Sequence, residues 1–508
     1  INRCFWRVKL LYDQYWFLIY SSVFNRYCIT LLIFFIGCQS KGFKDNQIQI
    51  LAKVGNRVIT LQDYLHRSEY SLRPDYCRGN LYIHKKIILN NLIAEKLLAI
   101  ESDKVKNNNR SDNLLAFLKG RKEQAMRQLL YYEKGYKKVE LKDDEINHFF
   151  KISERTYHVN YFSFPGGNFA DSVNQAMNDG IPIEKIYSIN FEGNIPSRDV
   201  NWIDNNDPII SDKLFNNQIK KGDIIGPYTL KDGSAFLLKV NGWTDHLDLS
   251  EKSYLDKKEK VINTLKDRKG REIYRVFIGK IMKGKEINFN KDVFLPYSQS
   301  IQNQFFRSRK QKENAISNAL FDSGEFLSLE DIKPMNQKYK YLDLFTLNGD
   351  NWTVKDFEKE ISSHPLVFRK KKMKHSEFST QFKLAIIDFI QDLYLTKEAY
   401  KIGLDKTNTV KLNESLWSDS FSAYQAAKLW MESQSESDKQ HILMKPIIDV
   451  LQKKYSSEIF INMNLFESIS LSNVDMFVTQ SNVPYPVIVP SFPSFTNDSY
   501  LDYGSEIK

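Results

Sequence analysis

The sequence predicts an α+β protein of several domains in which helices outnumber strands. Its 508 residues exceed what one hydrophobic core supports, so about three domains are expected. Long stretches repeat apolar residues at helical spacing, whereas parts of residues 157–240 alternate apolar and polar residues as strands do. A strand–turn–strand–helix pattern occurs near position 50 and again near position 343. Together these three observations define the fold class.

The composition is that of a globular protein, with 42% hydrophobic and 26% charged residues. The net charge is +10, and part of this excess lies in residues 1–37. The remaining surplus is mild, so it favours anionic lipid or acidic polypeptides as partners and argues against nucleic acid. Cys77 is the only cysteine after Cys38, and we expect it to be an unpaired structural thiol.

An export signal is predicted near the amino terminus. An apolar run at 27–36 follows Arg26 and precedes a small residue, as in secretory signals. The stretch 35–38 (Phe-Ile-Gly-Cys) resembles the lipobox of bacterial lipoproteins, although that family prefers Leu at its first position. The resemblance implies that Cys38 is lipidated, which would anchor the protein to a membrane. One uncleaved anchor over 15–36 is the alternative, and either arrangement exports the rest of the chain.

A β-hairpin followed by a capped helix is predicted at 50–64. The two strands flank Gly55-Asn56, a dipeptide typical of tight hairpin turns. Thr60 then stands at an N-cap position with Asp63 three residues later, as in a capping box. Apolar residues at helical spacing predict further helices over 88–100, 112–135 and 141–150.

A small α+β unit is predicted at 155–243. Its elements, in order, are a strand at 157–164, a helix at 168–180, a strand at 199–203, a helix at 209–218 and a hairpin at 228–240. Such a strand–helix–strand–hairpin order makes a compact sheet covered by helices.

The hairpin and its capped helix recur in the second half of the chain. Residues 343–357 repeat the strand–turn–strand pattern, with Thr353 and Asp356 in the cap positions. Residues 386–398 match the long helix at 89–101. A weaker match joins two further segments, 281–289 and 451–463, in each of which a helix end leads into an Ile-Asn pair. The pattern indicates a repeat that lacks the α+β unit, and chance similarity of two amphipathic helices is the alternative.

Three stretches follow one another in residues 50–150: Val54-Gly-Asn-Arg-Val-Ile-Thr60, Leu89-Asn-Asn-Leu-Ile-Ala-Glu-Lys-Leu-Leu98 and Asp143-Asp-Glu-Ile-Asn-His-Phe-Phe150. They resemble the amino-terminal part of the SurA/PrsA class of exported chaperones. Asp199-Val-Asn-Trp202 and Lys221-Gly-Asp-Ile-Ile-Gly-Pro227 resemble two stretches of parvulin-type peptidyl-prolyl isomerases. The resemblance implies an α+β multidomain fold of helical SurA-like modules with an inserted parvulin-like domain.

The parvulin resemblance also implies where an active site would lie. Isomerisation of an X-Pro bond needs no covalent step, only a site that favours the twisted amide. In parvulins two histidines on adjacent central strands line the floor of that site. His158 stands at the first of these positions and Phe236 at the second, so the second histidine is missing. Trp202 and Phe236 are expected to contact substrate. Isomerase activity is expected to be weak or lost, and His158 can equally be a structural strand histidine.

The expected domains follow from these resemblances. They are a signal with an over-long gene start at 1–37, a SurA-like module at 38–150, a parvulin-like domain at 151–245, a helical return segment of the first module at 246–300, a second SurA-like module at 301–470 and a Pro-rich, poorly ordered tail at 471–508.

The resemblance implies a chaperone that binds unfolded or newly exported polypeptides and is lipid-anchored facing the periplasm, with the outer membrane favoured if the cell has one. No metal or cofactor is expected, and the oligomeric state stays open. An active peptidyl-prolyl isomerase is the first alternative. A scaffold for one dedicated partner is the second.

Overall fold

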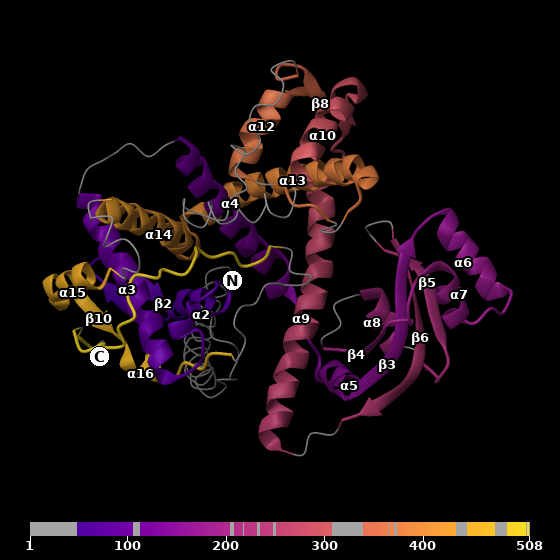
Figure 1. Ribbon diagram of the computed structural model, residues 1–508, viewed down its shortest axis with the longest axis horizontal. Helices are drawn as coiled ribbons and strands as arrows, with labels where there is room; N and C mark the ends of the chain where they lie inside the picture. Colours follow the sequence, from indigo (N-terminus) through magenta and orange to yellow (C-terminus); the bar gives the residue numbers. More distant parts are fainter. Residues whose placement is uncertain are drawn as a thin grey trace, which may run out of the picture. The chain divides into compact units, whose positions relative to one another are not determined.

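The computed structural model describes the chain from Ile48 onward, with gaps. The residues outside the description are 1–47, 105–111, 204–207, 217, 231–233, 247–249, 307–338, 365, 370–372, 433–443, 473–484, 504 and 507–508. The predicted signal and Cys38 therefore lie outside the described residues. Helices and several small sheets make up the described part, which confirms the mixed α and β class (Figure 1). Within it, every helix is too short or too polar to cross a membrane.

The first hairpin forms as predicted. Strands β1 (Ile50–Val54) and β2 (Arg57–Thr60) pair antiparallel around a two-residue turn in which Gly55 has a φ of +57°. This backbone conformation favours glycine, because other side chains clash there. Thr60 caps helix α2 (Leu61–Glu69) through a capping box with Asp63.

The second hairpin repeats the strand–turn–strand–cap order, but its turn has positive φ at both residues and not at the first alone. Strands β8 (Asp343–Leu347) and β9 (Asp350–Thr353) flank Asn348 and Gly349, which both have positive φ as a type I′ turn requires. Thr353 caps helix α12 (Val354–Ser363) through the same capping box, here with Asp356. Both predicted caps are thus confirmed.

Each hairpin is completed by a third strand from outside the segment in which its module was predicted. Strand β7 (Ile287–Phe289), which follows the predicted return segment, pairs with β8 of the second hairpin. Strand β10 (Ile459–Ile461), near the end of the predicted second module, pairs with β1 of the first. The predicted boundaries at 246–300 and 301–470 therefore need correction, because the two modules exchange their third strands. Local patterns define a strand but do not select its partner.

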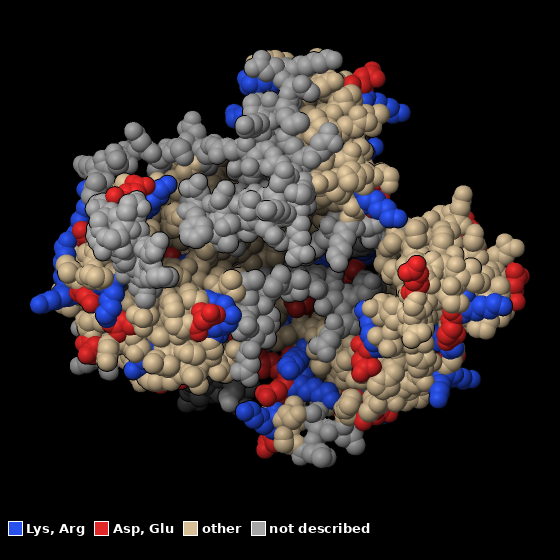
Figure 2. Space-filling view, in the orientation of Figure 1, with Lys and Arg blue, Asp and Glu red and all other residues tan. Residues whose placement is uncertain are grey.

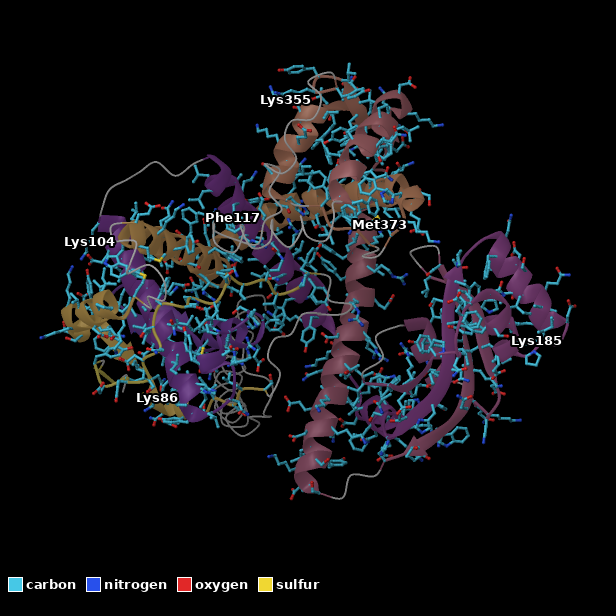
Figure 3. The ribbon with its side chains drawn as sticks, in the orientation of Figure 1. Lys86, Lys104, Phe117, Lys185, Lys355 and Met373 are labelled. Atoms are coloured by element: carbon cyan, nitrogen blue, oxygen red, sulfur yellow. The ribbon has the colours of Figure 1, made fainter. Side chains whose placement is uncertain are left out.

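Two hydrophobic cores follow from this exchange. The first core gathers the first hairpin, β10 and several helices, and the second gathers β7, the second hairpin and three helices. Helices of the first core are α2, α3 (Tyr82–Lys104), α14 (Asn408–Glu432), α15 (Lys445–Lys454) and α16 (Met463–Glu467). Those of the second are α10 (Lys291–Phe305), α12 and α13 (Phe378–Lys401). Met373, which is labelled in Figure 3, belongs to this second core.

Helices α4 (Asp112–Lys134) and α9 (Glu251–Met282) connect these cores. Both contact α13, and α4 also packs on α14, where Phe117 lies edge-on against Trp417 at a centroid distance of 5.4 Å (Figure 3). The 3-10 turns η2 (Tyr136–Lys138) and η4 (Leu404–Lys406) contact α4. Further short 3-10 turns are η1 (Asp75–Cys77), η3 (His375–Glu377) and η6 (Ser456–Glu458). Cys77 is buried without a disulfide, as predicted.

The predicted small α+β unit forms a four-stranded antiparallel sheet in the order β4-β3-β6-β5 (Figure 1). Its elements are α5 (Asp143–Ser153), β3 (Arg155–Pro165), α6 (Asn168–Asn178), α7 (Ile183–Asn190), β4 (Ser197–Asn201), α8 (Pro208–Phe215), β5 (Ile224–Thr229) and β6 (Ser234–Asp245). Helices α6 and α7 cover one face, whereas α5, α8 and α9 cover the other. The sheet thus has a core on each side.

Residues 485–503 of the carboxy-terminal tail are packed, whereas a poorly ordered tail was predicted over 471–508. Its described stretch 485–503 forms neither helix nor long strand, yet it buries Val489, Phe492 and Phe495. The segment runs along α3 and α14, as the yellow trace in Figure 1 shows, and ends in β11 (Ser505–Glu506), which pairs parallel with β10. Proline prevents regular structure but does not prevent burial, which the composition argument overlooked.

Candidate functional site on the inserted sheet

Strand β3 presents two different faces to its surroundings. Tyr157 and Val159 belong to the core beneath α5, α8 and α9. Phe162 and Phe164 belong to the core beneath α6 and α7. Because side chains alternate along a strand, His158 lies on the α6–α7 face.

His158 joins a polar network that spans three adjacent strands. Its Nδ1 lies 2.7 Å from the Oδ1 of Asp199 on β4, and its Nε2 lies 2.8 Å from the Oγ1 of Thr244 on β6. The strand pairing explains this, since His158 stands directly opposite Asp199. A carboxylate, an imidazole and a hydroxyl are therefore connected in series.

The exposure of this network limits its chemistry. The side chains of His158 and Asp199 are 42% and 69% exposed, so water reaches both of them. A carboxylate can orient an imidazole that takes a proton from a hydroxyl, as in hydrolytic triads. Such catalysis depends on a site that excludes water and stabilises developing charge. The network at His158 is best explained as a polar ladder that joins β4, β3 and β6.

Phe236 does not lie beside His158. On β6 it stands opposite Ser163, five residues along β3 from His158, which corresponds to about 17 Å. It also belongs to the opposite face, in the core beneath α8. The residue opposite His158 is Gly242, next to a β-bulge. The two positions that the parvulin resemblance pairs therefore do not form one site, because the strand register separates them.

Trp202 is a core residue. It is 1% exposed, and its ring stacks on Phe149 of α5 at 4.8 Å. The guanidinium of Arg268 lies 4.1 Å from the ring centroid and donates a 2.7 Å hydrogen bond to the Trp202 carbonyl. Burial lowers the pKa of Arg268 to about 10. These contacts fix α5 and α9 onto the sheet, and they enclose the indole instead of offering it to a substrate.

An aromatic strip lies on the face that holds Phe236. We define it as Tyr161 of β3, Tyr228 of β5 and Phe236 of β6. Phe236 is buried, whereas the two tyrosines are half-buried, and Tyr228 lies 6.0 Å from the Phe236 ring. Tyr161 stands opposite Leu238, two residues from Phe236 on the same face of β6. This strip could not be predicted from the sequence, because only the strand register places the three rings together.

Two cations flank the aromatic strip. The guanidinium of Arg198 lies 5.1 Å from the centroid of the Tyr161 ring, and the ammonium of Lys213 lies 5.8 Å from that of Tyr228. Partly exposed rings can contact apolar and aromatic side chains of a bound polypeptide. The cations beside the rings can contact its backbone carbonyls or acidic side chains.

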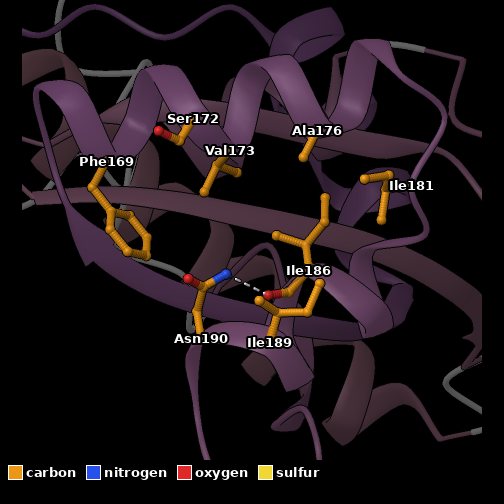
Figure 4. A pocket seen from close by; sticks show the side chains of 8 residues that line it. All are labelled: Phe169, Ser172, Val173, Ala176, Ile181, Ile186, Ile189 and Asn190. Atoms are coloured by element: carbon orange, nitrogen blue, oxygen red, sulfur yellow. Dashed lines mark hydrogen bonds between the residues drawn. The ribbon is translucent and has the colours of Figure 1, made fainter.

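A separate apolar cleft lies between α6 and α7. Figure 4 shows Phe169, Val173, Ile186 and Ile189 around it, and its volume is about 150 Å³. Asn190 on its rim donates a 2.8 Å hydrogen bond to the Ile186 carbonyl. No titratable side chain lines this cleft, so its chemistry is limited to accepting an apolar group.

The surface charge is mixed on the face shown in Figure 2, where basic and acidic side chains are interspersed. Among the described residues, His, Cys, Asp and Glu side chains do not gather in threes as a metal site requires. Neither a protein-family model nor a curated protein sequence matches this chain. A functional proposal therefore draws on the geometry of the residues described above and on the stretches of sequence that resemble known families.

Proposed function

We propose that this protein is a lipid-anchored, extracytoplasmic chaperone that binds unfolded or newly exported polypeptides. Its inserted domain is parvulin-like and has little or no isomerase activity. The lipid anchor is proposed from the predicted signal and Cys38 alone. The polypeptide-binding activity is proposed from the SurA-like stretches together with the aromatic strip.

The aromatic strip is the observation that carries the proposal. Tyr161 and Tyr228 expose part of their rings on a sheet face, with a cation beside each. A binder of unfolded chains needs apolar contact area without a fixed hydrogen-bond code, because its clients differ in sequence. Tyrosine provides such area at a low cost in conformational entropy.

The position of His158 argues against strong isomerase activity. A single imidazole that is open to water and paired with Asp199 and Thr244 does not enclose a proline ring. The other position that the family resemblance marks is Phe236, on the opposite face. The active-isomerase alternative thus lacks the second histidine that the family resemblance expects beside His158.

The proposal is tested by suppression of aggregation, measured by light scattering for several unrelated, thermally unfolding client proteins. We expect the double variant Tyr161→Ala/Tyr228→Ala to weaken client binding about thirty-fold, since each lost ring removes about 1 kcal/mol of contact and about 2 kcal/mol corresponds to that change in affinity. The matched control is Tyr341→Ala, because Tyr341 is 69% exposed in the second module, away from the strip. Circular dichroism checks that each variant stays folded.

A proline-peptide isomerisation assay separates the alternatives. We expect the wild-type protein to be close to the uncatalysed rate and His158→Ala to change nothing. Clear acceleration that disappears in His158→Ala would favour the active isomerase. Protection of one client alone, with no effect on the others, would favour the dedicated scaffold.

A further inference from the structure

The described tail shows a period of three in its burial. From 489 to 497, two residues are buried and the third is exposed, three times in succession. The sequence has the same period: Val489-Pro490-Ser491, Phe492-Pro493-Ser494, Phe495-Thr496-Asn497. A polyproline II helix has three residues per turn and no internal hydrogen bonds. The tail therefore has the periodicity of a polyproline II segment that lies in a groove.

The groove holds this segment by its backbone. The side chain of Asn91 on α3 accepts hydrogen bonds from the amides of Phe495 and Thr496, at 2.8 and 2.9 Å, and donates one of 2.7 Å to the Thr496 carbonyl. Arg67 of α2 donates a 2.6 Å hydrogen bond to the Ser491 carbonyl. Contacts of this kind do not depend on the identity of the bound side chains.

Asn90 extends the backbone contacts towards the end of the tail. Its Nδ2 donates 2.7 Å hydrogen bonds to the carbonyls of Asp498 and Tyr500, and its Oδ1 accepts from the Tyr503 hydroxyl. Proline has no amide N–H to donate. Pro490 and Pro493 do not interrupt the contacts, because the amides that donate to Asn91 are those of Phe495 and Thr496. The apolar contacts come from Phe492 and Phe495, which belong to the first core.

The tail supplies hydrogen-bond partners to three buried polar residues of the groove. Arg67, Asn90 and Asn91 are completely buried. A buried polar group without a partner is strongly unfavourable. Arg67 is also paired with Glu95, and Asn91 also donates to the Ile87 carbonyl, but main-chain atoms of the tail contribute hydrogen bonds to all three residues. The groove therefore offers backbone-directed hydrogen bonds to an extended polypeptide.

We infer that the groove between α2 and α3 is a binding site for polyproline II segments built from repeats of an apolar residue, a proline and a small polar residue. The chain's own tail is its resident occupant, and an incoming segment of the same chemistry displaces the tail. This site goes beyond the proposed function and does not depend on the aromatic strip, because it uses other residues and another recognition mode.

The test uses the full chain and a fluorescent peptide with the sequence of 487–500. The tail competes as an intramolecular ligand, so the wild-type protein should bind the peptide weakly. The variant Phe492→Ala/Phe495→Ala loosens the tail but leaves the groove unchanged. We expect it to bind the peptide about ten-fold more tightly than wild type by fluorescence anisotropy.

Two controls define the site. A peptide with alanine at both phenylalanine positions should bind the Phe492→Ala/Phe495→Ala protein about ten-fold more weakly than the original peptide does. This difference should be the same whether the protein's own tail is bound or released. Adding Asn91→Ala to the variant should abolish binding of the original peptide. The inference is overturned if the tail variant keeps its circular dichroism spectrum but binds neither peptide, or binds both equally. It is also overturned if the tail variant unfolds, because the tail is then a fixed part of the fold.

Discussion

The two long helices that follow the two hairpins, α3 and α13, share a sequence pattern but are buried differently. α3 is buried without interruption from Ile87 to Ala99. α13 buries one stripe and exposes residues such as Lys383 and Lys397. The difference arises because the first hairpin, α14, α15 and the tail surround α3 on all sides. Equal local patterns thus lead to unequal environments when the non-local partners differ.

An acid–base pair occurs at matched places in the two modules. Glu95 is the seventh residue of the stretch 89–101 in α3, and Asp392 is the seventh residue of the matching stretch 386–398 in α13. Glu95 accepts two hydrogen bonds from Arg67, at 3.2 and 2.8 Å, and both side chains are at most 1% exposed. Asp392 lies 3.0 Å from His364 and is 21% exposed. The tail contacts both pairs, since the Ser491 carbonyl accepts a hydrogen bond from Arg67 and the Tyr485 hydroxyl donates one to Asp392.

The largest expected effect comes from breaking the buried pair. Glu95→Ala leaves the Arg67 guanidinium buried without its carboxylate, which should cost about 3–5 kcal/mol in the free energy of unfolding. The matched Asp392→Ala should cost less, about 1–3 kcal/mol, because Asp392 itself is 21% exposed, although it also accepts a hydrogen bond from Tyr485 and lies 3.5 Å from Arg127. Urea denaturation followed by circular dichroism measures both values.

An apolar replacement sharpens this comparison. Arg67→Met/Glu95→Leu removes both charges at once and should recover most of the loss, since no buried charge is left unpaired. Equal losses for Glu95→Ala and Asp392→Ala would show that enclosure of the first pair does not matter.

The sequence predicted the local features of this fold well. Both hairpins, both capping boxes and the helix at 112–135 form where they were predicted. Each depends on residues only a few positions apart. The exchange of β7 and β10 was not predicted, because strand pairing over more than 50 residues leaves no local pattern. The burial of Asn90, Asn91 and Glu95 was missed for the same reason.

The candidate site was predicted less well. His158 was placed correctly on the first central strand, but its partners Asp199 and Thr244 depend on the pairing of three strands. The family resemblance paired Phe236 with His158, whereas the register places it five residues away and on the other face. Alternation along β3 could have indicated two faces, but only the register brings Tyr161 close to Phe236.

The two capping boxes should respond equally to mutation. Thr60→Ala and Thr353→Ala each remove the side-chain oxygen that accepts the third amide of the following helix. We expect each to lower the free energy of unfolding by about 1 kcal/mol. Thermal and urea denaturation measure the pair, with Thr60→Ser and Thr353→Ser as controls that keep the hydroxyl. A clear loss in one module only would show that the two boxes do not contribute alike.

The smallest expected effect is a difference in acid sensitivity between the modules. Burial lowers the pKa of His66 on α2, while the nearby carboxylates Asp63 and Glu69 act in the opposite direction. As the pH falls, His66 is therefore protonated in the unfolded chain before it is protonated in the folded protein. His66 should thus leave stability intact above about pH 6.5 and reduce it as the pH falls through the lower folded-state pKa. His66→Gln should flatten the pH dependence of unfolding between about pH 7 and 5. Lys359→Gln, at the matched position of α12, is the control and should leave the slope unchanged. An identical slope in wild type and His66→Gln would remove His66 as a source of acid sensitivity in the first module.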